Sequence, residues 1–184
     1  MTNIRQNLSE IIRNRRSIKK GYLPKEVDKE LIISLLNDAV WAPNHGLREP
    51  WRFIFVSNDR KDAFLQSILA CFPPNQHEQM LAKFKDVPAF LIVIMKTDPR
   101  QKQWEENFAA TSCLIQNFQL LAWEKQLGVV WKTPNFIYDP IFYKELNVEK
   151  DEKIIGMLQI GYFDESAPAP ERKRTAAKKK LTFF

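Results

Sequence analysis

The spacing of apolar side chains divides most of the chain into helices and strands. Isoleucine and leucine recur at helical spacing within residues 4–14, which predicts an amphipathic helix with Asn3 as its cap. A second helix is expected over residues 28–41, because Asp28 can cap its first turn and Pro43 prevents it from continuing. Two helices, separated by a basic segment that ends at Gly21, are therefore expected in the N-terminal quarter of the chain.

Apolar runs further along the chain predict strands separated by helices. The strands are expected over residues 51–57, 88–96, 129–133 and 154–163, and the helices over residues 59–71, 76–86, 104–127 and 138–146, with Gly128 ending the longest helix. The segment 88–96 is almost continuously apolar, as is typical of a strand buried on both faces. Because helices and strands do not alternate strictly, this order favours an α+β fold over a doubly wound sheet.

The periodic pattern stops at residue 164. The segment 164–184 contains six basic and three acidic residues, so it contributes +3 of the chain's net charge of +6. It ends in Leu-Thr-Phe-Phe, and a solvated tail has no use for two terminal phenylalanines. We therefore expect residues 1–163 to form one domain and residues 164–184 a basic arm that docks on another subunit.

Several classes of function lack their usual motifs in this sequence. Five glycines form no phosphate-binding loop, and two histidines with two cysteines give neither a metal site nor a disulfide framework. No signal peptide or transmembrane segment is visible, so a cytoplasmic protein with no membrane partner is expected. The basic tail could contact nucleic acid or a phosphate, or it could simply be solubilising charge on an arm. It has no interleaved aromatic residues, which favours no nucleic-acid partner. An enzyme with so few reactive side chains usually depends on a cofactor.

Arg15, Arg16 and Ser17 form the first candidate site. Two guanidinium groups and a hydroxyl can converge on a phosphate, and these residues follow the first predicted helix. Because the dipole at a helix C-terminus repels anions, the side chains themselves must supply the positive field. The alternative is a solvated basic cluster that complements the dipole, and residue type alone favours that alternative.

The stretch WAPNHGLREPWRF, residues 41–53, forms the second candidate site. His45 lies in a turn between two prolines, with Trp41 and Trp51 on either side. The turn can form walls for a planar ligand, with His45 as a hydrogen-bond donor. Equally, it can be a simple connection from helix to strand with Trp51 in the core.

The stretch GVVWKTP, residues 128–134, forms the third candidate site. Its backbone N–H groups can point at a ligand that Trp131 shields and Lys132 contacts with its charge. Taken alone, the stretch is better explained as an ordinary strand with Trp131 in the core.

Together, these segments resemble the FMN-dependent nitroreductase family, and most closely its compact branch of NAD(P)H nitroreductases. The resemblance rests on RRSI at 15–18, APNHGLREPWRF at 42–53, the long helix with GVVWKT at 104–133, and IIGMLQIGY at 154–162. The terminal LTFF is similar to the closing aromatic pair of that family. These motifs occur in the family's order and span most of the chain.

The resemblance implies an α+β homodimer, with a central, mostly antiparallel sheet flanked by helices and two FMN sites at the subunit interface. It assigns the FMN phosphate and pyrimidine edge to the arginine-serine motif, and contacts from the opposite subunit to the turn. The segment after the long helix would lie along the isoalloxazine ring, where a backbone N–H can reach N5. The implied cofactor-binding residues are Arg15, Arg16, Ser17, Trp41, His45, Trp131, Lys132 and Thr133.

The implied activity is hydride transfer from NAD(P)H to FMN and then to a nitroaromatic, a quinone or a similar acceptor. FMN carries the chemistry, so no catalytic side chain and no metal are expected. Nicotinamide nucleotide is expected near residues 122–127. Two residues depart from the family pattern, because Pro134 stands where glycine is frequent and Glu49 where glutamine is common. The alternative is flavin-dependent dehydrogenation of a metabolite on the same scaffold.

Overall fold

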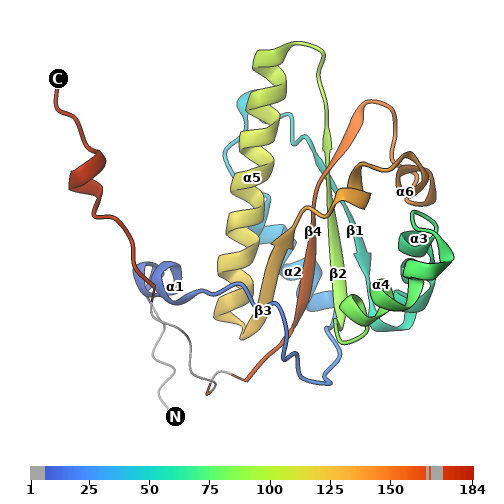
Figure 1. Cartoon of the computed structure of the whole chain (residues 1–184). Coiled ribbons are helices and arrows are strands. Elements are labelled where there is room, and N and C mark those ends of the chain that lie inside the picture. Colours follow the sequence, from blue (N-terminus) through green and yellow to red (C-terminus); the bar gives the residue numbers. More distant parts are fainter. Residues whose placement is uncertain (1–6, 165, 167–171) are drawn as a thin grey trace.

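A four-stranded antiparallel sheet forms the centre of the molecule (Figure 1). The computed structural model describes residues 7–164, 166 and 172–184. The helices are α1 (Leu8–Asn14), α2 (Lys29–Ala39), α3 (Lys61–Leu69), α4 (His77–Phe84), α5 (Gln101–Glu124) and α6 (Pro140–Glu145), and the strands are β1 (Trp51–Val56), β2 (Ala89–Lys96), β3 (Leu127–Lys132) and β4 (Glu152–Tyr162). The predicted α+β class and the predicted order of helices and strands are confirmed.

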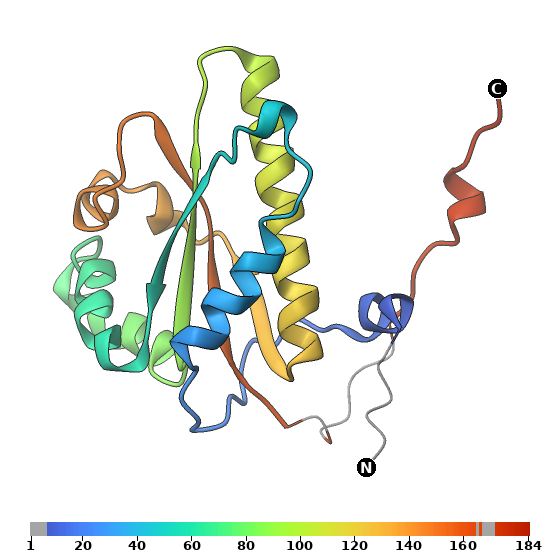
Figure 2. The same cartoon turned by 180° about the vertical axis from the view of Figure 1, so that it is seen from behind.

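Helices cover both faces of the sheet, whose strand order is β1-β2-β4-β3. Helices α2 and α5 pack on one face, and α3, α4 and α6 lie on the other (Figures 1 and 2). Strand β2 is central and its residues 89–95 are buried, which confirms the prediction from its continuous apolar run. Strand β3 is an edge strand, so its outer side is open to other parts of the chain.

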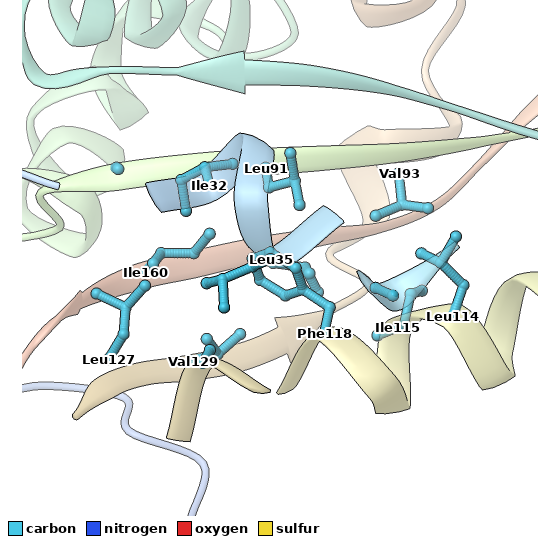
Figure 3. Close-up of a cluster of buried hydrophobic side chains, with 14 of the residues drawn as sticks. Ile32, Leu35, Leu91, Val93, Leu114, Ile115, Phe118, Leu127, Val129 and Ile160 are labelled. Carbon is cyan, nitrogen blue, oxygen red and sulfur yellow. The ribbon is translucent and has the colours of Figure 1, made fainter. Parts of the chain in front are cut away.

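Side chains of alternating orientation divide the core into two clusters. Leu91 and Val93 of β2 pack with Leu114, Ile115 and Phe118 of α5, as Figure 3 shows. The intervening residues of β2 point to the opposite face and join the phenylalanines of α3, α4 and α6. Successive side chains of a strand point to opposite faces of the sheet, and in β2 the residues on both faces are apolar.

Most helix ends differ from the predicted bounds by one to four residues, and two of these differences have a clear physical cause. Helix α1 begins at Leu8 because Asn7 forms a capping box with Glu10, whereas Asn3 lies outside the described residues. Helix α5 ends at Glu124, and Gly128 lies inside β3. The prediction that Gly128 ends this helix was therefore wrong, and the left-handed residue that follows the helix is Gln126, with φ of 58°.

Gly156 of β4 is a position where only a hydrogen fits. A Cβ there would overlap the indole of Trp131, which packs across the strand and donates its N–H to the carbonyl of Ile155 at 3.1 Å. We expect Gly156→Ala to lower the free energy of unfolding by about 2 kcal/mol, measured by urea denaturation, because overpacking forces a well-packed side chain to move. The loss of unfolding free energy caused by Gly156→Ala should be smaller in a protein that also carries Trp131→Ala. An equal loss with and without Trp131→Ala would refute this explanation.

The last described part of the C-terminal arm, residues 172–184, separates from the body of the protein beside α1 in both views (Figures 1 and 2). Its one short helix is Ala177–Lys180, and the side chains of Leu181, Phe183 and Phe184 are exposed. The division of the chain into a domain and an arm, and the docking of this arm on another subunit, stay predictions.

Candidate functional site

Residues 15–22, here called the strap, run along the open edge of β3. Ser17 pairs with Val129 in a parallel bridge, and Ile18 lies against Gly128, where a Cβ would be only 2.7 Å from the Ile18 side chain. Tyr22 fixes the end of the strap because it pairs with Phe163 and its hydroxyl donates to the Ile18 carbonyl at 2.6 Å. Gly128 is therefore needed for close approach of the strap.

Four arginines from the two ends of the chain meet at the start of the strap. Arg172 of the C-terminal arm donates a hydrogen bond to the carbonyl of Arg15. Arg16 donates to the carbonyls of Arg13 and Asn14 at 2.9 and 2.5 Å. Arg174 lies close enough to act on the charge of Arg15. Arg15, Arg16, Arg172 and Arg174 are called the arginine cluster below.

The arginine cluster has hydrogen-bond donors without partners and positive charge without counter-charges among the described residues. Nε and Nη1 of Arg15 and Nε of Arg16 are buried and have no hydrogen-bond partner among the described residues. None of the ion pairs within the described part of the chain includes an arginine of the cluster. Burial, followed by the charges of Arg172, Arg16 and Arg174, lowers the pKa of Arg15. Buried donors without partners are costly, so the arrangement fits an anion such as a phosphate.

An aromatic slot with a volume of about 410 Å³ lies at the end of β3. Its apolar walls are Phe72, Met80, Phe84, Pro134 and Phe136, and its polar lining is Lys83, Lys132 and Asn135. No carboxylate is among the described residues that line it. Its size and apolar walls are typical of small-molecule sites.

Lys132 joins the slot to the strap. Its side chain lies on the same sheet face as Met157, and burial, followed by the charge of Lys19 in the strap, lowers its pKa. Lys83, on α4, places its Nζ 3.5 Å from the sulfur of Met80. Two ammonium groups and the Asn135 amide therefore border a slot with apolar walls, an arrangement suited to a planar ligand with electronegative edges.

A second, larger cavity of about 530 Å³ lies at the turn 21–26. Its lining mixes Lys25, Lys61 and Lys85 with Glu26 and Asp86. None of the residues predicted from the sequence as site residues lines it. The aromatic slot, which contains Lys132, is therefore the better candidate despite its smaller volume.

The side chain of Trp131 points away from the slot. Residues 129 and 131 of β3 face α5, whereas Lys132 faces the slot. The Trp131 indole packs over Gly156 in the core, in agreement with the structural alternative that the sequence left open. Any contact of Trp131 with a ligand in the slot would come from its backbone, and Thr133 follows at the exposed end of the strand.

His45 lies beside the N-terminal part of α5, whereas Ala39, two residues before Trp41, lies farther along that helix, where its carbonyl accepts a hydrogen bond from Asn117 at 3.4 Å. His45 Nδ1 is 3.9 Å from Glu106, which also pairs with Arg48 at 3.1 Å. From Glu106 to the end of α5 is about 27 Å along the helix axis. Trp41 is 83% exposed. A single chain therefore brings together the strap, the arginine cluster and Lys132, but not His45.

The structure adds site residues that sequence patterns did not select. Arg172 and Arg174 stand in a tail without periodicity, where a basic run is usually solvated. Lys83 and the phenylalanines of the slot read as ordinary helix residues until the fold brings them beside Lys132. Among the described residues there is no group of histidine, cysteine, aspartate and glutamate that could hold a metal, and no helix that could cross a membrane.

Comparison with known proteins gives a consistent picture. The Nitroreductase family model matches residues 12–162. A Bacillus subtilis protein named "Putative NAD(P)H nitroreductase YfhC" is 41% identical, over 95% of this chain and 93% of its own length. A nitroreductase-like protein from Bacillus cereus superposes with a TM-score of 0.90 at 39% identity, covering 100% of this chain and 98% of that one.

A more distant structure shares the fold. A nitroreductase from Desulfovibrio desulfuricans, solved in complex with FMN, has a TM-score of 0.74 at 20% identity and covers 97% of both chains. The family model spans the strap, the long helix, β3 and β4, and the sequence motifs occur in the same order. The chain belongs to the nitroreductase family.

Proposed function

We propose that the protein is an FMN-dependent oxidoreductase that passes hydride from NAD(P)H to FMN and then to a nitroaromatic, quinone or similar acceptor. The observation that carries this proposal is the arginine cluster, whose buried guanidinium nitrogens lack partners among the described residues, together with a slot with aromatic walls at the end of the same strand, β3. FMN has a phosphate dianion and a planar ring, and this edge of the sheet offers a complementary group for each.

Arg15, Arg16 and Ser17 would hold the phosphate end of FMN, with Arg172 and Arg174 completing the positive field. The slot would take the ring, and its phenylalanines would exclude water from one face. Lys132 and Lys83 would sit at the ring's electronegative edge. The backbone of residues 131–133 would supply N–H groups beside the ring. This assignment is supported by the arginine donors that have no partner among the described residues, and by the lack of a carboxylate among the described residues that line the slot.

Bound FMN would supply the hydride chemistry, so the protein needs no general acid or base of its own. The tasks left to the chain are binding, orientation and electrostatics, and its side chains match those tasks. Relatives named as NAD(P)H nitroreductases support nicotinamide nucleotide as the hydride source.

A homodimer would complete the site. His45 lies too far along α5 to reach the strap of its own chain, so a second copy would bring its His45, and with it the turn that contains Trp41, to that site. The exposed Leu181, Phe183 and Phe184 give the C-terminal arm an apolar end that could dock on that copy. Two such composite sites per dimer follow from twofold symmetry.

Steady-state oxidation of NADH and NADPH, with and without a nitroaromatic or a quinone, tests the proposed reaction. We expect FMN-dependent oxidation that an acceptor accelerates in the absence of oxygen. The alternative, dehydrogenation of a metabolite, predicts reduction of bound FMN by that metabolite and none by either nucleotide. This second outcome would replace the proposed reaction.

Lys132 offers a test of the slot's electrostatics. We expect Lys132→Met to weaken FMN binding about tenfold near neutral pH, because a cation beside the ring edge is lost. Fluorescence titration with FMN measures this change. The exposed Lys178 of the arm, changed to methionine, serves as the control and should leave the affinity unaltered; equal losses in both variants would argue against the slot.

The same variant has a predicted pH signature without cofactor. Because burial and Lys19 lower the pKa of Lys132, the folded state binds fewer protons than the unfolded state between that lowered pKa and 10.5. This lysine therefore makes stability rise as the pH increases through that window. Urea midpoints measured across it should rise less in Lys132→Met than in the wild type, and parallel curves would contradict the stated cause.

A further inference from the structure

The C-terminal arm is attached to the rest of the described structure at one point. Arg172 is partly buried, whereas every other residue of 172–184 is exposed. Among the described residues, the hydrogen bond that joins the arm to the body runs from the Arg172 guanidinium to the Arg15 carbonyl. The hydrogen bond from Lys179 to Ala176 stays within the arm. Seating of the arm therefore depends on the surroundings of Arg172.

Those surroundings repel the arm electrostatically. Seating Arg172 brings it toward Arg15, Arg16 and Arg174, and no ion pair among the described residues neutralises this charge. Burial and the charges of Arg174 and Arg16 lower the pKa of Arg172, which shows that the environment disfavours its cation. An anion between the guanidinium groups would turn this repulsion into attraction, with bonds from both sides.

We propose that a phosphate group bound in the arginine cluster latches the C-terminal arm to the body, so that loading of the phosphorylated cofactor and docking of the arm are coupled. The identity of the phosphate carrier rests on the proposed function, whereas the latch itself requires only a phosphate. The arm carries its apolar end, with Phe183 and Phe184, about ten residues beyond the latch. Fixing Arg172 and Arg174 therefore raises the local concentration of that end near its docking surface.

The coupling acts in both directions. If phosphate binding favours the seated arm, the seated arm must favour phosphate binding by the same factor. A docked arm end would then slow the dissociation of FMN. In the cofactor-free protein the arm would dock less tightly on the second copy, so the dimer would be weaker. The latch would thus link assembly of the dimer to cofactor supply.

Hydrogen exchange of residues 175–184, followed by mass spectrometry on the full chain, tests the latch. These residues exclude the cluster itself, so their protection reports on the arm and not on direct contact with phosphate. We expect saturating FMN to slow their exchange about tenfold, and riboflavin, which lacks the phosphate, to leave it unchanged. Inorganic phosphate at high concentration should act in the same direction as FMN.

Matched variants separate the latch from general charge. The double variant Arg172→Gln, Arg174→Gln should abolish the effect of FMN on arm exchange. The double variant Lys178→Gln, Lys179→Gln removes the same number of positive charges from the arm outside the cluster, and it should retain the effect.

The outcomes distinguish this inference from the proposed function. If FMN binds, as its absorption spectrum shows, but arm exchange does not change, the latch is wrong and the proposed function stands. If riboflavin protects the arm as well as FMN does, the phosphate is not the latch. If no flavin binds but inorganic phosphate protects the arm, the latch is right and the proposed function is wrong.

Discussion

Replacing Arg15 with glutamine is expected to weaken FMN binding about 100-fold, the largest loss from a single substitution in the site. Arg15 is at the centre of the arginine cluster, with two buried nitrogens that have no partner among the described residues. A charged hydrogen-bond donor lost from a partly buried phosphate site costs much more than one lost at the surface. Titration of the cofactor-free protein with FMN, followed by flavin fluorescence, measures the effect.

Two controls show whether the loss is specific to the phosphate. Arg13→Gln removes an exposed arginine from the end of the same helix and should leave FMN affinity within about twofold. Riboflavin should bind equally to Arg15→Gln and to the wild type, because it lacks the phosphate. A variant that lost riboflavin and FMN binding equally would place Arg15 at the ring and contradict the assignment.

The same substitution should stabilise the cofactor-free protein. Burial and the neighbouring Arg172, Arg16 and Arg174 disfavour the Arg15 cation in the folded state. A neutral amide at this position relieves that repulsion, so the urea midpoint without FMN is expected to rise while FMN affinity falls. Opposite changes in stability and affinity are typical of residues kept for binding.

The arginine cluster shows how far sequence alone reaches. Arg15, Arg16 and Ser17 could be selected because two guanidinium groups and a hydroxyl stand together in a short motif. Arg172 could not be assigned, because its contact with Arg15 spans 157 positions and its segment has no periodicity. Only the folded chain shows that the two basic segments meet.

A heterodimer built from two damaged chains is expected to recover about half of the wild-type FMN sites and activity. One chain carries Arg15→Gln, and the other carries Trp41→Ala with His45→Ala. If each site takes its arginine from one chain and its turn from the other, one of the two sites in this heterodimer is intact. The expected parent activities are near background, so the recovery is large.

Purification with two different affinity tags isolates the heterodimer for FMN titration and turnover measurements. Because Trp41 is so exposed, its loss should not disturb the fold, and circular dichroism of each parent checks this. The matched control is a heterodimer in which one chain carries all three substitutions and its partner carries none. Activity no higher than in the parents would mean that the turn does not act across the interface.

Secondary structure was largely predictable because its signals are local. The continuous apolar run of β2 and the Asp28 cap of α2 both correspond to the observed elements. Gly128 was misassigned because glycine after a helical pattern usually marks a helix end, whereas here its lack of a Cβ admits Ile18 of the strap. The slot was beyond sequence reasoning, since Lys83 of α4 and Lys132 of β3 line the same cavity only in the folded chain.

The most direct test of the central claim is the visible absorption spectrum of the purified protein after incubation with FMN and removal of the excess. The account predicts a bound flavin spectrum that bleaches when NADH or NADPH is added without oxygen and returns when an acceptor is added. A protein that retains no FMN at any concentration tested, while remaining folded, would contradict the assignment of the arginine cluster and the slot as a flavin site.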